Sequence, residues 1–126
     1  MNVYNDKRLS KILGYIKRHR PQMRDHIDRI AKTQYKMKRK TFDFYPKSST
    51  TWGEFSVTLA WDFFTWSAID QEANLIHEAQ HCLDITKLGT ARYFVEYNFQ
   101  QVTKGYDKNK FEVGAEVAEA YYLHGK

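Results

Sequence analysis

Apolar residues recur at helical spacing in the first 40 residues of the chain. The members of the first set share one face of a predicted helix: Leu9, Ile12, Leu13 and Ile16. Asn5 is a candidate N-cap for this helix, and Pro21 is expected to end it because the residue before a proline avoids helical geometry. Proline suits a first helical turn, so we expect a second helix from Pro21 to about Met37. Its inward-facing residues are expected to be Met23, Ile27, Ile30 and Met37.

The period of the pattern changes after Thr41. Phe42-Asp43-Phe44 alternates between apolar and polar residues, and the stretch from Glu54 to Trp61 alternates in the same way. A period of two is typical of strands with one buried face. We therefore expect a short antiparallel sheet, with these residues facing inward from its second strand: Phe55, Val57, Leu59 and Trp61.

Helical spacing returns in the second half of the chain. Ser67 or Asp70 can cap a helix that Gly89 ends, and its expected core residues are Ile69, Ala73, Ile76, Ala79 and Leu83. A helix from Thr90 to Gly105 is expected to bury Phe94, Val95, Phe99 and Val102. A last helix is predicted from about Phe111 to Leu123. The whole pattern predicts an α+β fold.

Length and charge divide the chain into two parts. A chain of 126 residues is most simply one domain, 1–126. Residues 1–40 form a basic helical segment with thirteen Lys and Arg against three Asp, a net charge of +10, whereas residues 41–126 carry −5. The lone Cys82 excludes an internal disulfide and is expected in the core. Because neither a signal peptide nor a membrane segment is apparent, we expect the protein in the cytoplasm.

One short motif carries candidate chemistry. His77-Glu78-Ala79-Gln80-His81 places two imidazoles four residues apart, so on the predicted helix they lie on one face and can bind one Zn²⁺. Glu78 is then placed as the general base of a zinc hydrolase. A catalytic zinc usually takes a third protein ligand. Asp84, three residues after His81, could bind, although such an acid more often supports a ligand or lies in solvent.

The motif and the segments after it resemble the small gluzincin metallopeptidases, the minigluzincins. The similarity spans about residues 52–124 and rests on the HEAQH stretch, on residues 88–94, on Gly105-Tyr106 and on residues 109–115. It implies a minimal zincin-like fold with a small antiparallel sheet packed on the central HExxH helix. It also implies that Glu112, on the C-terminal helix, is the third zinc ligand, and that the strand from Gly53 to Ala60 lines the substrate cleft.

The resemblance suggests further site residues and shows two departures from the family pattern. Lys110 stands where proline is usual, and Glu116 takes the place of an acid that orients the first histidine, where it could accept the second ring proton of His77. Gluzincins often supply a Tyr or His to stabilise the oxyanion. The candidates for that role are Tyr106, Tyr121, Tyr122 and His124.

These observations predict a zinc metallopeptidase that acts on a polypeptide. In this hypothesis Glu78 accepts a proton from water and returns it to the leaving amine. An alternative is a zinc-containing binding module without peptidase activity, whose basic residues 1–40 contact nucleic acid or an acidic protein. Structural zinc sites normally use four Cys and His ligands, and one cysteine argues against that alternative. The substrate and the oligomeric state are not predicted.

Overall fold

The computed structural model describes residues 2–40, 48–51 and 56–124 of the chain. Within these ranges the protein is mostly helical, with a small sheet. The helices are α1 (Lys7–His19), α2 (Arg24–Ala31), α3 (Ala68–Leu88), α4 (Thr90–Lys104) and α5 (Lys110–His124), and the strands are β1 (Gln34–Met37), β2 (Ser49–Thr51) and β3 (Ser56–Leu59). The predicted α+β class is confirmed at this level. The expected strand at Phe42–Phe44, and Gly53 to Phe55 of the next, lie outside the described residues.

The N-terminal helices follow the predicted pattern in part. Asp6, and not Asn5, caps α1, because its Oδ1 accepts hydrogen bonds from the backbone N–H groups of Arg8 (2.9 Å) and Leu9 (3.1 Å). Pro21 opens a short 3-10 turn (Pro21–Met23) that leads into α2. The apolar residues confirmed as buried in α1, in α2 and in the turn between them are Leu9, Leu13, Ile16, Met23, Ile27 and Ile30.

The second helix is shorter than predicted, because α2 ends at Ala31 and the chain continues as strand β1. Residues 34–37 pair in parallel with Ser56–Leu59 of β3, so backbone pairing with a distant strand prevails over local helical spacing. Met37 is consequently 39% exposed on a strand and does not line a helix face. Lys36 lies in this strand, and the basic residues Lys38, Arg39 and Lys40 follow it directly.

The sheet is mixed, which corrects the expectation of an antiparallel one. Its order is β1-β3-β2, with β1 parallel and β2 antiparallel to the central strand β3. Both faces of β3 are largely covered, since Ser56, Val57 and Leu59 are each at most 2% exposed. Of the residues expected to face inward, Val57 and Leu59 are buried, Trp61 lies beyond the strand and is 39% exposed, and Phe55 lies outside the described residues.

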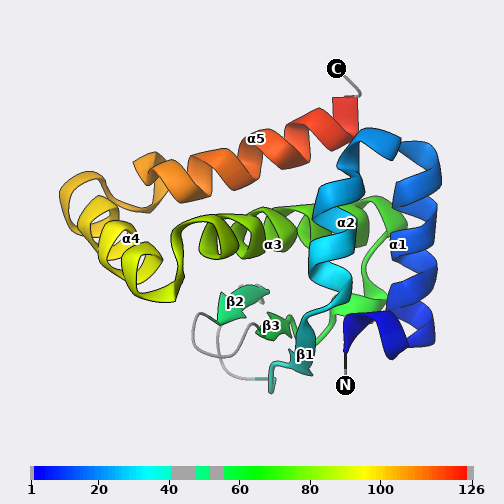
Figure 1. The fold of residues 1–126 in the computed structure, drawn as a ribbon. Coiled ribbons are helices and arrows are strands. Elements are labelled where there is room, and N and C mark those ends of the chain that lie inside the picture. Colours follow the sequence, from blue (N-terminus) through cyan, green and yellow to red (C-terminus); the bar gives the residue numbers. More distant parts are fainter. Residues whose placement is uncertain (1, 41–47, 52–55, 125–126) are drawn as a thin grey trace.

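Helix α3 lies at the centre of the molecule. In Figure 1, α5 runs along one side of α3 and the sheet lies on the other side. Helices α1 and α2 also pack against α3. The Ser67 hydroxyl caps α3 by accepting from Asp70 N (3.2 Å), and Gly89, with φ 85°, ends it, both as predicted. Because neighbours surround it, α3 buries more residues than a single stripe would: Glu72, Ala73, Leu75, Ile76, Glu78, Ala79, His81, Cys82 and Ile85. Ile69 was expected in the core but is 61% exposed.

Helix α4 does not face the core with its most apolar side, as predicted, but with the opposite side. Tyr93 is buried, at 1% exposed, and its ring packs against Phe111 with centroids 4.7 Å apart. The residues expected to be buried are more than half exposed instead: Phe94, Val95, Phe99 and Val102. Gly105, with φ 77°, ends α4 as predicted. Helix α5 then begins next to the buried Asn109, whose Oδ1 accepts from Phe111 N (3.0 Å).

Candidate metal centre

Two histidines and one glutamate converge where α3 and α5 run side by side. His77 and His81 occupy successive turns of α3, and Glu112 projects from the first turn of α5. Their Nε2, Nε2 and Oε1 atoms form a triangle with edges of 3.2 Å (His77–His81), 3.2 Å (His77–Glu112) and 3.0 Å (His81–Glu112). His81 and Glu112 are buried and His77 is partly buried. The three residues that the sequence and the resemblance suggested are therefore brought together.

The size of this triangle suits a metal ion. Zinc bonds of about 2.0–2.2 Å in tetrahedral geometry place neighbouring ligand atoms roughly 3.3–3.5 Å apart, close to the observed edges. Two imidazole nitrogens and a carboxylate oxygen are also a usual ligand set of a catalytic zinc that keeps its fourth position open. The donor chemistry and the spacing fit Zn²⁺, and His77, His81 and Glu112 form a group that could hold it.

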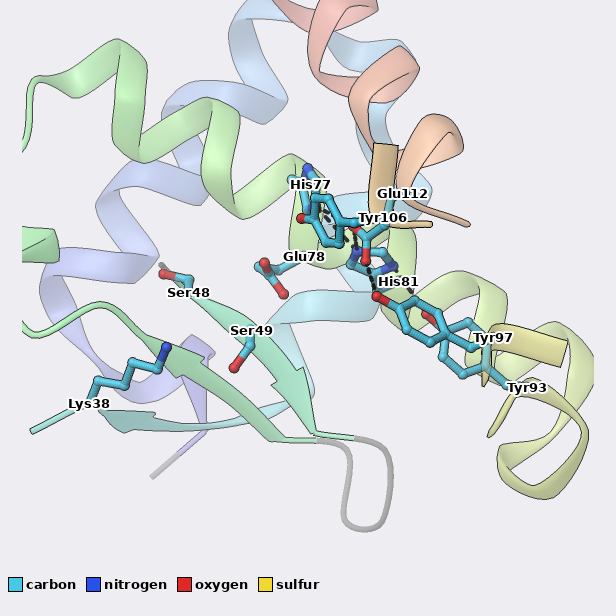
Figure 2. Close-up of a pocket in the computed structure, with 10 residues that line it drawn as sticks. All are labelled: Lys38, Ser48, Ser49, His77, Glu78, His81, Tyr93, Tyr97, Tyr106 and Glu112. Atoms are coloured by element: carbon cyan, nitrogen blue, oxygen red, sulfur yellow. Dashed lines mark hydrogen bonds and ion pairs between the residues drawn. The ribbon is translucent and has the colours of Figure 1, made fainter. Parts of the chain in front are cut away.

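Each residue of the triad is held by a second partner on its outer side. His77 Nδ1 is hydrogen-bonded to Glu119 Oε1, and His81 Nδ1 lies 3.2 Å from the Tyr93 hydroxyl. Figure 2 shows the Tyr97 hydroxyl, which donates to Glu112 Oε2 at 2.5 Å. If both Nε2 atoms offer lone pairs to a metal, both protons sit on Nδ1 and are donated to Glu119 and Tyr93. Such outer contacts fix the orientation of metal ligands.

The carboxylate behind His77 was expected at Glu116 and is Glu119. Helices α3 and α5 are antiparallel, since His81 meets Glu112 and His77 meets Glu119. Nδ1 of His77 therefore faces further along α5, about two turns and roughly 10 Å beyond Glu112, which is the position of Glu119. Glu116, one turn after Glu112, is exposed. Around the helix axis, Glu119, seven residues after Glu112, points within about 20° of the direction of Glu112. Glu116, four residues after Glu112, points about 40° away on the other side.

The charges of the triad depend on these hydrogen bonds. Burial opposes protonation of His77, but its hydrogen bonds with Glu112 and Glu119 outweigh burial and raise its pKa to about 10. Burial would raise the pKa of Glu112, yet hydrogen bonds with His77 and His81 lower it well below its usual value. Burial, followed by interactions with Glu112, raises the pKa of Tyr97 and brings that of Tyr106 to about 12. Both phenols therefore remain protonated hydrogen-bond donors at neutral pH.

A pocket opens in front of the triad, between α3 and the sheet. Its volume is about 350 Å³, within the range of pockets that bind small ligands. The lining residues come from the triad, from the sheet and from the tyrosines around α4: Lys38, Ser48, Ser49, His77, Glu78, His81, Tyr93, Tyr97, Tyr106 and Glu112. In Figure 2 the Glu78 carboxylate lies between the triad and the two serines. The predicted general base is thus buried at 2% exposed and still lines the pocket.

Of the four oxyanion candidates, the structure brings Tyr106 to this pocket. Tyr122 is buried elsewhere and donates to Glu72, Tyr121 is 38% exposed, and His124 is exposed at the end of α5. Asp84 does not belong to the triad. Its Oδ1 accepts from Gln80 Nε2 at 3.1 Å, and burial raises its pKa.

The sequence interpretation missed Tyr93 and Tyr97. The available signal was their i, i+4 spacing, which places both hydroxyls on one face of α4. That signal is weak, because Phe94, Val95 and Phe99 on the same helix offered a more apolar face. Lys110, at the usual proline position, pairs its Nζ with Glu96 (3.1 Å), and its backbone N–H donates to Gln100 Oε1 (3.3 Å). A proline would lack both interactions.

No protein-family model matches the chain, and no curated protein or solved structure matches it either. The described helices include none that is long and apolar enough to span a membrane. What is shown is a His-His-Glu group that could hold a metal ion. The contact of residues 1–40 with nucleic acid or an acidic protein stays a prediction.

Proposed function

We propose that this protein is a zinc-dependent metallopeptidase of the gluzincin type. The proposal rests chiefly on one observation: the triad atoms of His77, His81 and Glu112 form a triangle with edges of 3.0–3.2 Å, next to a pocket that Glu78 also lines. The resemblance to minigluzincins supports it, since it implied a glutamate ligand on a C-terminal helix. A zinc ion bound there would supply Lewis acidity and a more acidic water molecule.

The protein's own groups would manage the proton and orient the ligands. Glu78 would accept a proton from the attacking water and return it to the leaving amine. Glu119, Tyr93 and Tyr97 would position the triad through their hydrogen bonds with His77, His81 and Glu112. The Tyr106 hydroxyl, protonated because its pKa is about 12, would donate a hydrogen bond to the developing oxyanion.

The strand that would present the substrate differs from the one that the resemblance implied. The segment Gly53 to Ala60 contains β3, which is central in the described sheet and paired on both sides. β2 (Ser49–Thr51) is an edge of that sheet, and Ser49 lines the pocket together with Ser48. An extended peptide could therefore add to β2, since backbone pairing at a sheet edge is a common mode of peptide recognition.

Metal analysis and hydrolysis of an unstructured protein substrate would test the proposal together. Wild-type protein purified without chelators should hold close to one zinc per chain and cleave the substrate. His81→Ala should lose both properties, because it removes a ligand. Glu78→Gln should keep the zinc and lose cleavage, because it removes only the base. Cleavage at the wild-type rate by Glu78→Gln, or a zinc-free active wild type, would refute the assignment.

The basic segment 1–40 is not a separable binding arm in this proposal. Leu9, Leu13 and Ile16 of α1 and Ile27 of α2 share one buried cluster with Ile76 of α3. Deleting residues 1–40 would therefore expose the core. Nucleic-acid binding is better tested with charge reversals at exposed positions of the full chain, where the salt dependence of binding should fall if phosphates are contacted.

A further inference from the structure

The metal-centre pocket extends past Glu78 to a lysine on the sheet side. Lys38 follows β1, and its backbone N–H donates to Leu59 O at 2.7 Å, which continues the pairing of β1 with β3. Ser48 precedes β2 at the same end of the sheet, where its Oγ accepts from Ala60 N at 3.0 Å. Lys38 and Ser48 therefore stand on the two strands that flank β3, roughly 9–10 Å apart in backbone position.

The polar groups of the pocket follow one another from the triad to the sheet. Figure 2 shows the triad at one end, Glu78 in the middle, and Ser48, Ser49 and Lys38 on the sheet side. Among the described residues that line the pocket, Lys38 is the only lysine or arginine. Its ammonium makes no ion pair or side-chain hydrogen bond with the part of the chain that the structure describes, unlike Lys17 and Lys110, which pair with carboxylates. A cation so placed is available to a ligand in the pocket.

The order of these groups indicates which part of a substrate meets Lys38. A scissile carbonyl would lie at the triad, and the leaving amine would lie at Glu78, which protonates it. The chain that follows the leaving amine then continues away from the triad, toward Ser48, Ser49 and Lys38. Two hydroxyls beside an ammonium are donors that suit a carboxylate, which accepts several hydrogen bonds at once.

We infer that Lys38, with Ser48 and Ser49, is a specificity-determining group that binds a carboxylate on the leaving-group side of the substrate. This inference rests on the proposed function and names its substrate class: peptides with a negative charge after the scissile bond. The carboxylate can be a free C-terminus or an Asp or Glu side chain. Both present the same chemistry to the ammonium.

Ligand binding tests the role of Lys38 without requiring turnover. The ligands are hydroxamates of graded chain length, in pairs that end in a carboxylate or in the neutral carboxamide, titrated calorimetrically into zinc-loaded protein. In wild type the best acid should bind about three- to tenfold more tightly than its amide, an advantage that added salt reduces. Lys38→Ala should abolish the difference, and Lys38→Glu should reverse it. The matched control is Lys36→Glu, two residues earlier in β1 and outside the pocket lining, which should keep it.

Peptide cleavage then separates the two carboxylate sources. One peptide pair differs by a free or amidated C-terminus, and the other by Glu or Gln after the scissile bond. The pair for which the ratio of kcat/KM values falls to about one in Lys38→Ala identifies the source.

Equal binding of acid and amide to wild type, or a preference that survives Lys38→Ala, overturns the inference about Lys38. Neither result contradicts the proposed metal site. If wild type prefers the acid hydroxamate over the amide, Lys38→Ala removes that preference and no peptide is cleaved, the carboxylate site is supported and the peptidase function is refuted. If zinc-loaded protein binds no hydroxamate, both are refuted.

Discussion

The hydroxyl of Tyr97 supports the glutamate of the candidate metal centre, and a conservative substitution can delete it. It donates to Glu112 Oε2 at 2.5 Å, while Oε1 of the same carboxylate faces His77 and His81. Tyr97→Phe deletes the hydroxyl and keeps the ring, whose centroid lies 6.1 Å from that of Phe111. We expect the substitution to leave the fold intact and to lower zinc affinity.

The expected size follows from the type of bond. A hydrogen bond to a charged group contributes about 1.5–3 kcal/mol, but part of this cancels in the affinity, because the bond exists with and without metal. The remaining contribution is the orientation of Glu112, and loss of such supporting contacts typically weakens metal binding about 10–100-fold. That range corresponds to roughly 1.4–2.7 kcal/mol. The part that cancels should appear as a lower free energy of unfolding of the metal-free protein.

Competition with a chromophoric chelator measures the zinc dissociation constant, and urea unfolding of the metal-free protein measures stability. The matched control is Tyr4→Phe, the same change at a residue that is 68% exposed, which should alter neither quantity. Zinc affinity of Tyr97→Phe within twofold of wild type, with His81→Ala abolishing binding, would show that Tyr97 does not support the site.

Three further predictions concern the site and the fold. Glu119→Gln should weaken zinc binding about 10–100-fold because it removes the carboxylate behind His77, whereas Glu116→Gln should bind like wild type in the same competition assay; the reverse order would refute the assignment. Hydrogen bonds from Tyr35 and from a backbone N–H outweigh burial and hold the pKa of Asp6 below its usual value. The contribution of Asp6 to stability is therefore present at neutral pH and is lost as the pH falls below about 4. Asp6→Asn should reduce this loss, measured as the urea concentration at the midpoint of unfolding between neutral and acidic pH. Gly89→Ala should cost about 1–3 kcal/mol of unfolding free energy in urea because φ is 85° there. Gly114→Ala, in α5, should not destabilise the protein, because no atom outside its own helix backbone and chain neighbours lies within 4 Å of the added Cβ.

Features set by neighbouring residues could be predicted from the sequence. Ser67 and Gly89 bound α3 as expected, because a cap and a left-handed glycine act within one turn. The pairing of His77 with His81 follows from helix geometry in the same way. The position of Glu112 was available only through the resemblance, because no local rule connects residues 31 apart in sequence.

Features set by distant packing could not be predicted in this way. Residues 34–37 show helical spacing, yet they form β1 because β3 offers its backbone. The choice between Glu116 and Glu119 depended on the antiparallel course of α5 along α3, which neither helix reveals alone. On α4, Tyr93 and Tyr97 point inward and their hydroxyls contact His81 and Glu112 of the candidate metal centre, whereas the more apolar face of the helix lies outward. Functional sites are where hydrophobic patterning is expected to fail.

The span between His81 and Glu112 has a consequence for the stability of the whole chain. An ion bound by both would join α3 to α5 and close a loop of 31 residues that contains α4, a constraint that the unfolded chain lacks. Each tenfold rise in free zinc above the dissociation constant would then add about 1.4 kcal/mol to the free energy of unfolding. The zinc level of its surroundings would thereby set the resistance of the protein to unfolding and proteolysis.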